Sequence, residues 1–251
     1  MVEVIRADVL AGVPHGFLGR RGGVSTGVVS GLNVCLGTGD EPEAVAQNRR
    51  LAADAVLSGA RLVTCYQVHS PDCVVAQEWP DAERPHADAL VTDRKGLVLG
   101  VVTADCAPVL LADRESGVVG AAHAGWKGAF TGVCEATVAA MVKLGARVDR
   151  IVAAVGPCIA QASYEVDDTF RARFIDQSSD NTVFFKSGRA GHWHFALEDY
   201  VAARLAAAGL ENVEKLGLDT YEAPDRFFSF RRATHAQEAD YGRQLALIGL
   251  G

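Results

Sequence analysis

At the centre of the chain lies Thr103-Ala-Asp-Cys-Ala-Pro-Val-Leu-Leu-Ala-Asp-Arg-Glu-Ser-Gly-Val-Val-Gly-Ala-Ala-His-Ala-Gly-Trp126. Three apolar runs precede it or fall within it, at residues 97–102, 108–112 and 118–122. Apolar runs of this length, bounded by Asp, Ser and Gly, are typical of buried strands. Cys106 and His123 therefore lie at predicted strand ends, where a rigid sheet can hold side chains at a fixed spacing.

The composition is that of an acidic chain with enough apolar residues for a sizeable core. Of its 251 residues 49% are hydrophobic, and the formal net charge is −7. This acidic balance argues against nucleic acid or an anionic membrane as the main partner. No stretch approaches the roughly 18 consecutive apolar residues of a membrane span. Charges within Met1–Asp8 lie where a signal peptide needs an apolar core, so we expect a cytoplasmic protein.

The six cysteines are expected to be mostly reduced in that compartment. No two of them form a C-x-x-C pair, which argues against a structural zinc ribbon. Cys134 falls on the apolar face of a predicted helix, so we interpret it as part of the core.

Periodicity in the rest of the chain predicts strands alternating with helices. A strand is expected at 62–68, paired with one at 73–76, and further strands at 151–155, near 192–195, at 227–232 and at 242–248. Helices are expected at 41–57, 126–146, about 167–174 and 197–209. Neither a low-complexity linker nor an internal repeat interrupts the chain. The simplest interpretation is a single α/β domain spanning residues 1–251.

The predicted helix at 41–57 carries two polar residues on or near its apolar side. Asp40 is predicted to cap its N-terminus. Asn48 lies near the middle of the apolar stripe and Arg49 at its margin. A polar side chain on a buried face needs a hydrogen-bond partner. Two interpretations remain open: the two residues brace neighbouring structure, or the helix presents them to a ligand.

A loop rich in glycine and arginine, His15 to Gly27, precedes this helix. Glycine lets backbone N–H groups approach an anion closely, and Arg20 or Arg21 could add positive charge. A plain surface loop explains the same composition equally well.

His69 ends the predicted strand before the central stretch, so its position matches those of Cys106 and His123. Catalytic zinc sites usually offer three protein ligands drawn from His, Cys, Asp and Glu and leave one position for water or substrate. Two histidines and one cysteine from different strand ends fit that number. Asp105 and Asp72 are candidate carboxylates for orienting ligands or transferring protons.

Other chemistries use similar atoms. A Cys-His hydrolase or deamidase would use Cys106 as its thiolate nucleophile and a histidine as base. A blue-copper site also uses two His and one Cys, with a weak axial ligand that is often Met, but the chain has only Met1 and Met141. Seven histidines, with His192 and His194 the one H-x-H pair, are too few for a multicopper oxidase. Neither H-x-E nor P-C-x-x-C occurs, which argues against a cytidine-deaminase-type site. A binding module with a structural metal is a further alternative.

Ordered sequence blocks along nearly the whole chain resemble the YfiH-like family, whose members are called polyphenol oxidases, laccase-domain proteins and purine nucleoside phosphorylases. The blocks are His15–Phe17, Gly22–Ser25, Gly31–Asn33, Asn48–Arg49, Gln67–His69, Ala87–Thr92, Thr103–Cys106, His123–Trp126, Gly156–Ile159 and Phe227–Arg232. The segment between Arg232 and Arg243 is longer than the family's usual pattern there.

The resemblance implies a layered α/β sandwich of mixed sheets flanked by helices, with zinc bound by His69, Cys106 and His123. Copper is the second metal it implies. The implied activity is phosphorolysis of adenosine, inosine, guanosine and S-methyl-5'-thioadenosine, with adenosine deamination beside it. His69, Cys106, His123 and Asp105 are then the expected catalytic residues. Copper-dependent polyphenol oxidation is retained as an alternative.

Purine nucleosides and inorganic phosphate are therefore the expected partners, and we expect a monomer. Phosphate needs cationic groups and N–H donors, for which the loop at 22–23 and the helix after Trp126 are further candidates. The family's conserved arginine corresponds to Arg49. The residues expected to contact substrate or phosphate are Arg49, Asn48, Asn33, Gly23 and Cys158.

Overall fold

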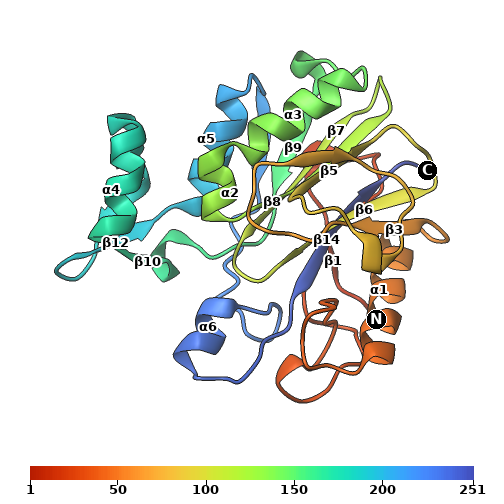
Figure 1. The fold of residues 1–251 in the computed structure, drawn as a ribbon, viewed down its shortest axis with the longest axis horizontal. Coiled ribbons are helices and arrows are strands. Elements are labelled where there is room, and N and C mark those ends of the chain that lie inside the picture. Colours follow the sequence, from red (N-terminus) through yellow and green to blue (C-terminus); the bar gives the residue numbers. More distant parts are fainter.

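The computed structural model describes residues 1–251, and two mixed sheets stacked face to face form its centre (Figure 1). The five-stranded sheet has the order β1-β2-β14-β6-β3. Its strands are β1 (Val4–Ile5), β2 (His15–Leu18), β3 (Arg61–Thr64), β6 (Leu97–Thr103) and β14 (Gln244–Gly249). Only β3 and β6 are parallel neighbours, and the other pairs are antiparallel.

The six-stranded sheet has the order β13-β9-β7-β8-β5-β4. Its strands are β4 (Cys73–Val75), β5 (Ala89–Thr92), β7 (Ala107–Asp113), β8 (Val118–Ala124), β9 (Val152–Val155) and β13 (Asn212–Lys215). The central strands β7 and β8 are buried along their whole length. Their continuous apolar runs are explained by this burial, because both faces of the sheet are covered.

Helices cover the outer faces of the two sheets, so the layers run helix, sheet, sheet, helix. The helix α1 (Pro42–Val56) packs on the five-stranded sheet, while α2 (Trp126–Thr131), α3 (Val133–Lys143) and α5 (Leu197–Ala207) pack on the six-stranded sheet (Figure 1). Alternate residues of β7 enter different cores: Leu110 packs between the sheets, and Leu111 packs under the helices. This alternation is the period of two expected of a strand buried on both faces. The predicted sandwich of mixed sheets flanked by helices is confirmed.

A smaller unit projects from the sandwich (Figure 1). It contains a three-stranded sheet of order β10-β12-β11 and the helix α4 (Asp168–Gln177). The strands are β10 (Glu165–Asp167), β11 (Phe185–Ser187) and β12 (His192–Phe195). Its aromatic side chains pack against α2 and α5, as the contact between Phe174 and Trp126 shows.

Several sequence-based boundaries are wrong. The strand expected at 62–68 ends at Thr64, and the strand at 73–76 pairs with β5 instead of β3. The helix expected at 126–146 is interrupted at Gly132, whose φ of 109° lies in the left-handed region that glycine adopts without strain. The segment 227–232 is not a strand, because its end forms the helix α6 (Phe230–His235).

The predicted cap of α1 is also wrong. The N-cap residue is Glu41. Asp40 instead accepts hydrogen bonds from Ser25 Oγ at 2.6 Å and Asn33 Nδ2 at 2.8 Å, which ties two loops together. Elsewhere, no helix combines the length and the apolar composition needed to cross a bilayer.

Candidate active site

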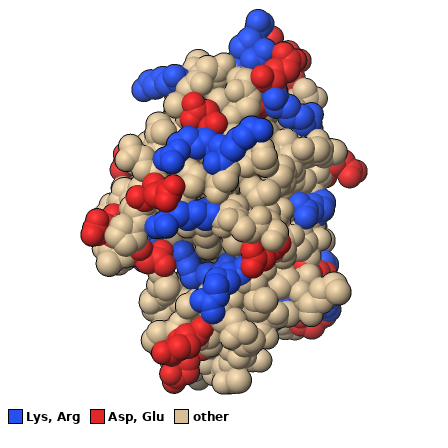
Figure 2. All heavy atoms as spheres, turned by 90° about the vertical axis from the view of Figure 1, so that its right-hand side faces the viewer, with Lys and Arg blue, Asp and Glu red and all other residues tan.

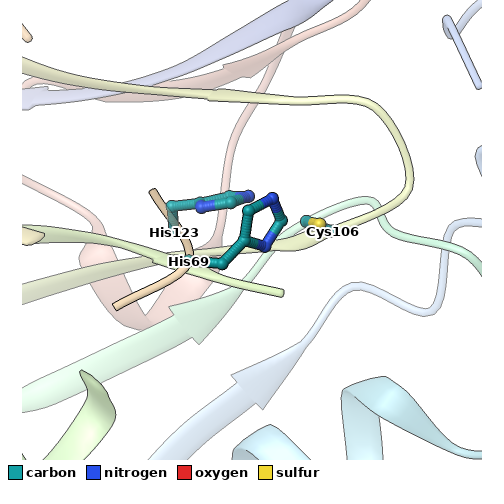
Figure 3. Close-up of side chains that lie close together, drawn as sticks. All are labelled: His69, Cys106 and His123. Carbon is teal, nitrogen blue, oxygen red and sulfur yellow. The ribbon is translucent and has the colours of Figure 1, made fainter. Parts of the chain in front are cut away.

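Three potential metal ligands come together near the start of β7 and the end of β8 (Figure 3). One ligand atom from each of His69, Cys106 and His123 lies within 4.8 Å of the other two, and this is the one cluster of its kind in the molecule. Cys106 directly precedes β7, and His123 lies in the neighbouring strand β8, opposite Pro108. The antiparallel pairing of β7 and β8 therefore fixes the spacing of two of the three residues.

His69 comes from a loop, five residues after the end of β3. Its φ is 59°, in the left-handed region that is uncommon for residues other than glycine. The carboxylate of Asp88 holds this conformation by accepting hydrogen bonds from the backbone N–H groups of Val68 (3.0 Å), His69 (3.0 Å) and Ser70 (2.7 Å). One buried anion thus fixes the loop that carries His69.

The same carboxylate orients His123. Asp88 Oδ1 lies 2.7 Å from Nδ1 of His123, and Asp88 is fully buried. Burial alone would raise the pKa of Asp88, but the hydrogen bonds to His123 and the loop outweigh it and lower this pKa to about 2. Burial likewise opposes protonation of His123, but Cys106 and Asp88 raise the pKa of His123 to about 9. With Nδ1 bonded to the carboxylate, Nε2 is the ring atom left to bind a metal.

Asp88 is a functional residue that was not expected from the sequence. Its signal was present: one acid stands between alanines at the start of the apolar segment Ala87–Thr92. A buried acid at such a position requires several donors, and these donors come from residues that are close only in the folded chain.

Gly125 is a second residue that the sequence reasoning missed. A Cβ atom at this position would lie 2.7 Å from Nδ1 of His69 and 2.9 Å from Sγ of Cys106. Both distances are shorter than real Cβ contacts, so only glycine lets the backbone pass this close to the two ligands. The residue types fit one metal ion with two imidazole ligands and one thiolate.

The cluster opens into a cavity of about 970 Å³. Aromatic side chains from α2 and the projecting unit line part of the wall: Trp126, Tyr164 and Phe170. Arginines also line it, and one of them is Arg49, which is only 7% exposed. Nη2 of Arg49 donates to Thr64 Oγ1 and to Asp81 Oδ1, both at 3.1 Å. Burial lowers the pKa of Arg49, and Asp81 partly offsets this effect.

Asp105 lines the cavity beside Cys106. Its φ is 82°, and its carboxylate accepts hydrogen bonds from Thr220 Oγ1 at 2.7 Å, Ser229 Oγ at 2.9 Å and the backbone N–H of Arg231 at 2.6 Å. These bonds hold the turn by which the chain leaves β6 and enters β7.

Four expected contact residues do not line the cavity. Asn48 is fully buried; its Oδ1 accepts from the N–H of Val24 at 2.9 Å, and its Nδ2 donates to the carbonyl of Asn33 at 2.8 Å. Asn33 Oδ1 accepts from the N–H of Arg243 at 3.1 Å. Asn48 and Asn33 therefore brace loops, which is the first of the two interpretations open for Asn48.

Gly23 and Cys158 are packed structurally. A Cβ at Gly23 would lie 2.2 Å from the carbonyl oxygen of Gly31, so this glycine permits a close backbone approach and not an anion contact in the cavity. Cys158 is 3% exposed and belongs to the core under the helices. Cys134 is buried in the same core, as expected.

The surface shown in Figure 2 carries lysine and arginine in small groups, with aspartate and glutamate between them. No continuous basic area covers this face.

Comparison with known proteins agrees with this architecture. The model of a family described as multi-copper polyphenol oxidoreductase laccase matches residues 14–251. A protein of Deinococcus radiodurans named purine nucleoside phosphorylase is 42% identical, with 99% of this chain and 93% of that protein covered. A Streptomyces coelicolor protein with the same description is 40% identical over 93% of this chain and 96% of its own.

Two solved structures share the fold over nearly their whole length. The Neisseria meningitidis protein NMB0706 superposes with a TM-score of 0.87 at 32% identity, covering 99% of this chain and 98% of its own. Bacillus licheniformis YfiH gives 0.85 at 29% identity, covering 94% and 92%. The chain therefore belongs to the laccase-domain, or YfiH-like, family, several of whose curated members are named purine nucleoside phosphorylases.

Proposed function

We propose that this protein is a metal-dependent purine nucleoside phosphorylase. The observation that carries the proposal is one cavity that combines the cluster of His69, Cys106 and His123 with both arginine and aromatic side chains. Such a cavity offers cationic donors for an oxyanion and flat apolar surfaces for a purine. About 40% identity to proteins named purine nucleoside phosphorylases supports it.

In phosphorolysis, an oxygen of inorganic phosphate forms a bond with the anomeric carbon of the nucleoside. The bond between that carbon and the purine nitrogen breaks, and its electron pair leaves with the purine, which takes up a proton. Arg49 would hold the phosphate through charge-assisted hydrogen bonds. Trp126 and Phe170 would hold the base and exclude water from the sugar. We assign Asp105 the task of holding the turn before Cys106, since its carboxylate already accepts three hydrogen bonds.

The metal we propose is zinc. Two histidines and one cysteine are a ligand set of catalytic zinc sites, and they leave a further position for a substrate atom. When bound, zinc supplies a Lewis acid that can polarise a substrate oxygen. Copper is the second candidate, because imidazole and thiolate also bind it. A multicopper centre needs several clusters, whereas this molecule has one.

We also propose the substrate range. Adenosine, inosine, guanosine and S-methyl-5'-thioadenosine share the purine and the ribose, and a cavity of about 970 Å³ has room for a substituent at the 5' position. Adenosine deamination is proposed as a second reaction in the same cavity, in which water replaces the amino group and ammonia leaves. We further propose that the enzyme acts in the cytoplasm as a single-domain monomer.

One observation favours a second candidate. Cys106, His123 and Asp88 follow one another in the order thiol, imidazole, carboxylate, which is also the order in a Cys-His-Asp hydrolase: a ligand atom of Cys106 lies within 4.8 Å of one of His123, and His123 Nδ1 lies 2.7 Å from Asp88 Oδ1. His69 separates the two possibilities, because a hydrolase of this kind does not need a third ligand. His69→Ala should abolish metal binding and turnover if the cluster holds a catalytic metal, and should leave turnover largely intact if Cys106 is a nucleophile.

The proposed function is tested by metal analysis of the purified protein followed by chromatography of the products from inosine and adenosine. We expect about one zinc per chain, and hypoxanthine with ribose 1-phosphate from inosine only when phosphate is present. Inosine formed from adenosine without phosphate would show deamination. If neither nucleoside is consumed by metal-loaded protein, the proposal is wrong.

A further inference from the structure

Arg243 is a cation in the active-site cavity without a carboxylate partner. It precedes β14 and lines the cavity together with His69 and Cys106. One end of its guanidinium contacts the sulfur of Cys35, and Nη2 donates to the hydroxyl of Tyr241 at 2.8 Å. Neither partner is a carboxylate, the group that normally accompanies a partly buried guanidinium. Arg243 therefore has electrostatic capacity left for a ligand.

Arg49 and Arg84 line the same cavity, and they share one carboxylate. Asp81 Oδ1 lies 3.1 Å from Nη2 of Arg49 and 3.9 Å from Nε of Arg84. Asp81 is itself 53% exposed, so solvent screens its charge, whereas Arg49 and Arg84 are only 8% and 17% exposed at their side chains. One partly screened anion thus faces two largely buried cations.

A short segment, Val34–Cys35, joins Arg49 to Arg243, while Asp81 joins Arg49 to Arg84. Arg49 Nη1 donates to the carbonyl of Val34 at 3.4 Å, and the next residue, Cys35, contacts Arg243. The N–H of Val34 in turn donates to the carbonyl of Arg243 at 3.1 Å. The arginine cluster, defined as Arg49, Arg84 and Arg243, is therefore a built feature of one wall of the cavity.

The charges of the arginine cluster do not balance within the protein. Three guanidinium groups face the single carboxylate of Asp81, which leaves two positive charges unmatched. Guanidinium groups match tetrahedral oxyanions through paired hydrogen bonds. A cation also lies at the aromatic wall: Arg231 stacks over Tyr164, 5.2 Å from its ring centroid, and donates to the backbone carbonyl of Glu165 at 2.9 Å. The arginine cluster is distinguished by the carboxylate that Arg49 and Arg84 share and by the segment Val34–Cys35, which contacts both Arg49 and Arg243.

We propose that the arginine cluster is the subsite for the dianion of inorganic phosphate, with Arg84 and Arg243 completing the contact expected of Arg49. The assignment rests on the proposed phosphorolysis and names where its nucleophile binds. Phosphate at this wall and the purine at the wall of Trp126, Tyr164 and Phe170 would place the sugar between them, beside the metal ligands.

The test compares Arg243→Gln with Arg189→Gln as a matched control. Arg189 also lines the cavity, but it is paired with Glu165 at 2.9 Å and lies outside the arginine cluster. Three quantities are measured on metal-loaded protein: the KM for phosphate with inosine, the affinity for phosphate by calorimetry without nucleoside, and the metal content. Because a charge-assisted pair is lost, Arg243→Gln should weaken phosphate binding by about 10- to 100-fold. Its KM for inosine should change by about 2-fold or less, and Arg189→Gln should match the wild type.

The outcomes separate the subsite from the function. Phosphate affinity unchanged in Arg243→Gln would overturn the subsite while leaving phosphorolysis intact. Loss of phosphate affinity in a protein that never cleaves nucleosides would support the subsite and refute the proposed function. If Arg243→Gln does not fold, Arg84→Gln provides the same comparison. Sulfate, an unreactive tetrahedral dianion, should compete with phosphate in the wild type and should compete more weakly in either variant.

Discussion

Replacing Asp88 with asparagine changes one oxygen to an amide group and leaves the volume of the side chain nearly unchanged. Oδ1 accepts from His69 N–H and His123 Nδ1, and Oδ2 accepts from Val68 N–H, Ser70 N–H and Ser70 Oγ. Whichever oxygen is replaced, at least two donors lose their acceptor. At about 1.5–3 kcal/mol for each hydrogen bond to a charged group, the free energy of unfolding should fall by about 3–6 kcal/mol.

The change also affects the tautomer of His123. Placing the amide nitrogen at the Oδ1 position removes two acceptor contacts instead of three, so we expect it to face Nδ1 of His123. There it donates a hydrogen bond where the carboxylate accepted one, so the neutral imidazole carries its proton on Nε2. A protonated Nε2 cannot bind a metal. We therefore expect the affinity for zinc to fall by about 10- to 100-fold or more, the range found when the carboxylate behind a ligating histidine is lost.

Three measurements check this reasoning: urea unfolding of metal-free protein, zinc affinity by competition with a chromophoric chelator, and ¹⁵N NMR of the histidine rings for the tautomer. Asp72→Asn is the matched control, since Asp72 is exposed and its side chain accepts no hydrogen bond within the protein. It should match the wild type in all three. Zinc affinity and tautomer unchanged in Asp88→Asn would refute the role assigned to Asp88.

Three further predictions concern Gly125, Cys106 and Asp113. Gly125→Ala should lower zinc affinity without unfolding the protein, because its Cβ would lie 2.7 Å from His69 Nδ1; equal zinc content after dialysis would contradict this. Cys106→Ser should stay folded by circular dichroism and lose both metal and turnover, and full activity in metal-free protein would exclude a catalytic metal. Asp113 is buried, and although burial opposes ionisation, hydrogen bonds from Arg147 N–H and the Arg150 side chain hold its pKa below the usual 3.8. The ionised Asp113 should therefore contribute its full share to the free energy of unfolding above about pH 4, and this contribution should decline as the pH falls further. The difference in urea midpoint between the wild type and Asp113→Asn should then become smaller in acid. A difference that stays constant with pH would contradict this role of Asp113.

The central strands and the neighbouring positions of Cys106 and His123 could be predicted because their signals are local, whereas the strand expected to end at His69 ends at Thr64. The apolar runs that became β6, β7 and β8 are bounded by turn residues, and Cys106 and His123 occur next to those boundaries. The resemblance to the YfiH-like family added the fold class, which the structure confirms. Boundaries failed where a tertiary contact overrides the pattern, as in the loop that ends β3 early and is held by Asp88.

Side chains on the helix α1 show a second limit of the sequence. Asn48 and Arg49 are neighbours in the chain, but on a helix they point about 100° apart. Asn48 is directed at the loop containing Val24 and Arg49 at the cavity. Periodicity identified both as unusual polar residues, but it contains no information about what lies opposite each of them. The arginine cluster was missed for the same reason, since its members come from three distant parts of the chain.

Two of the three proposed metal ligands lie on segments where the chain passes from one sheet to the other: Cys106 between β6 and β7, and His69 between β3 and β4. The distances between these ligands therefore depend on how the two sheets are stacked. Leu99 and Leu110 are fully buried in the layer between the two sheets. A substitution at either residue should therefore also alter the geometry of the active site. A change in the packing between the sheets should therefore also change the spacing of His69 and Cys106.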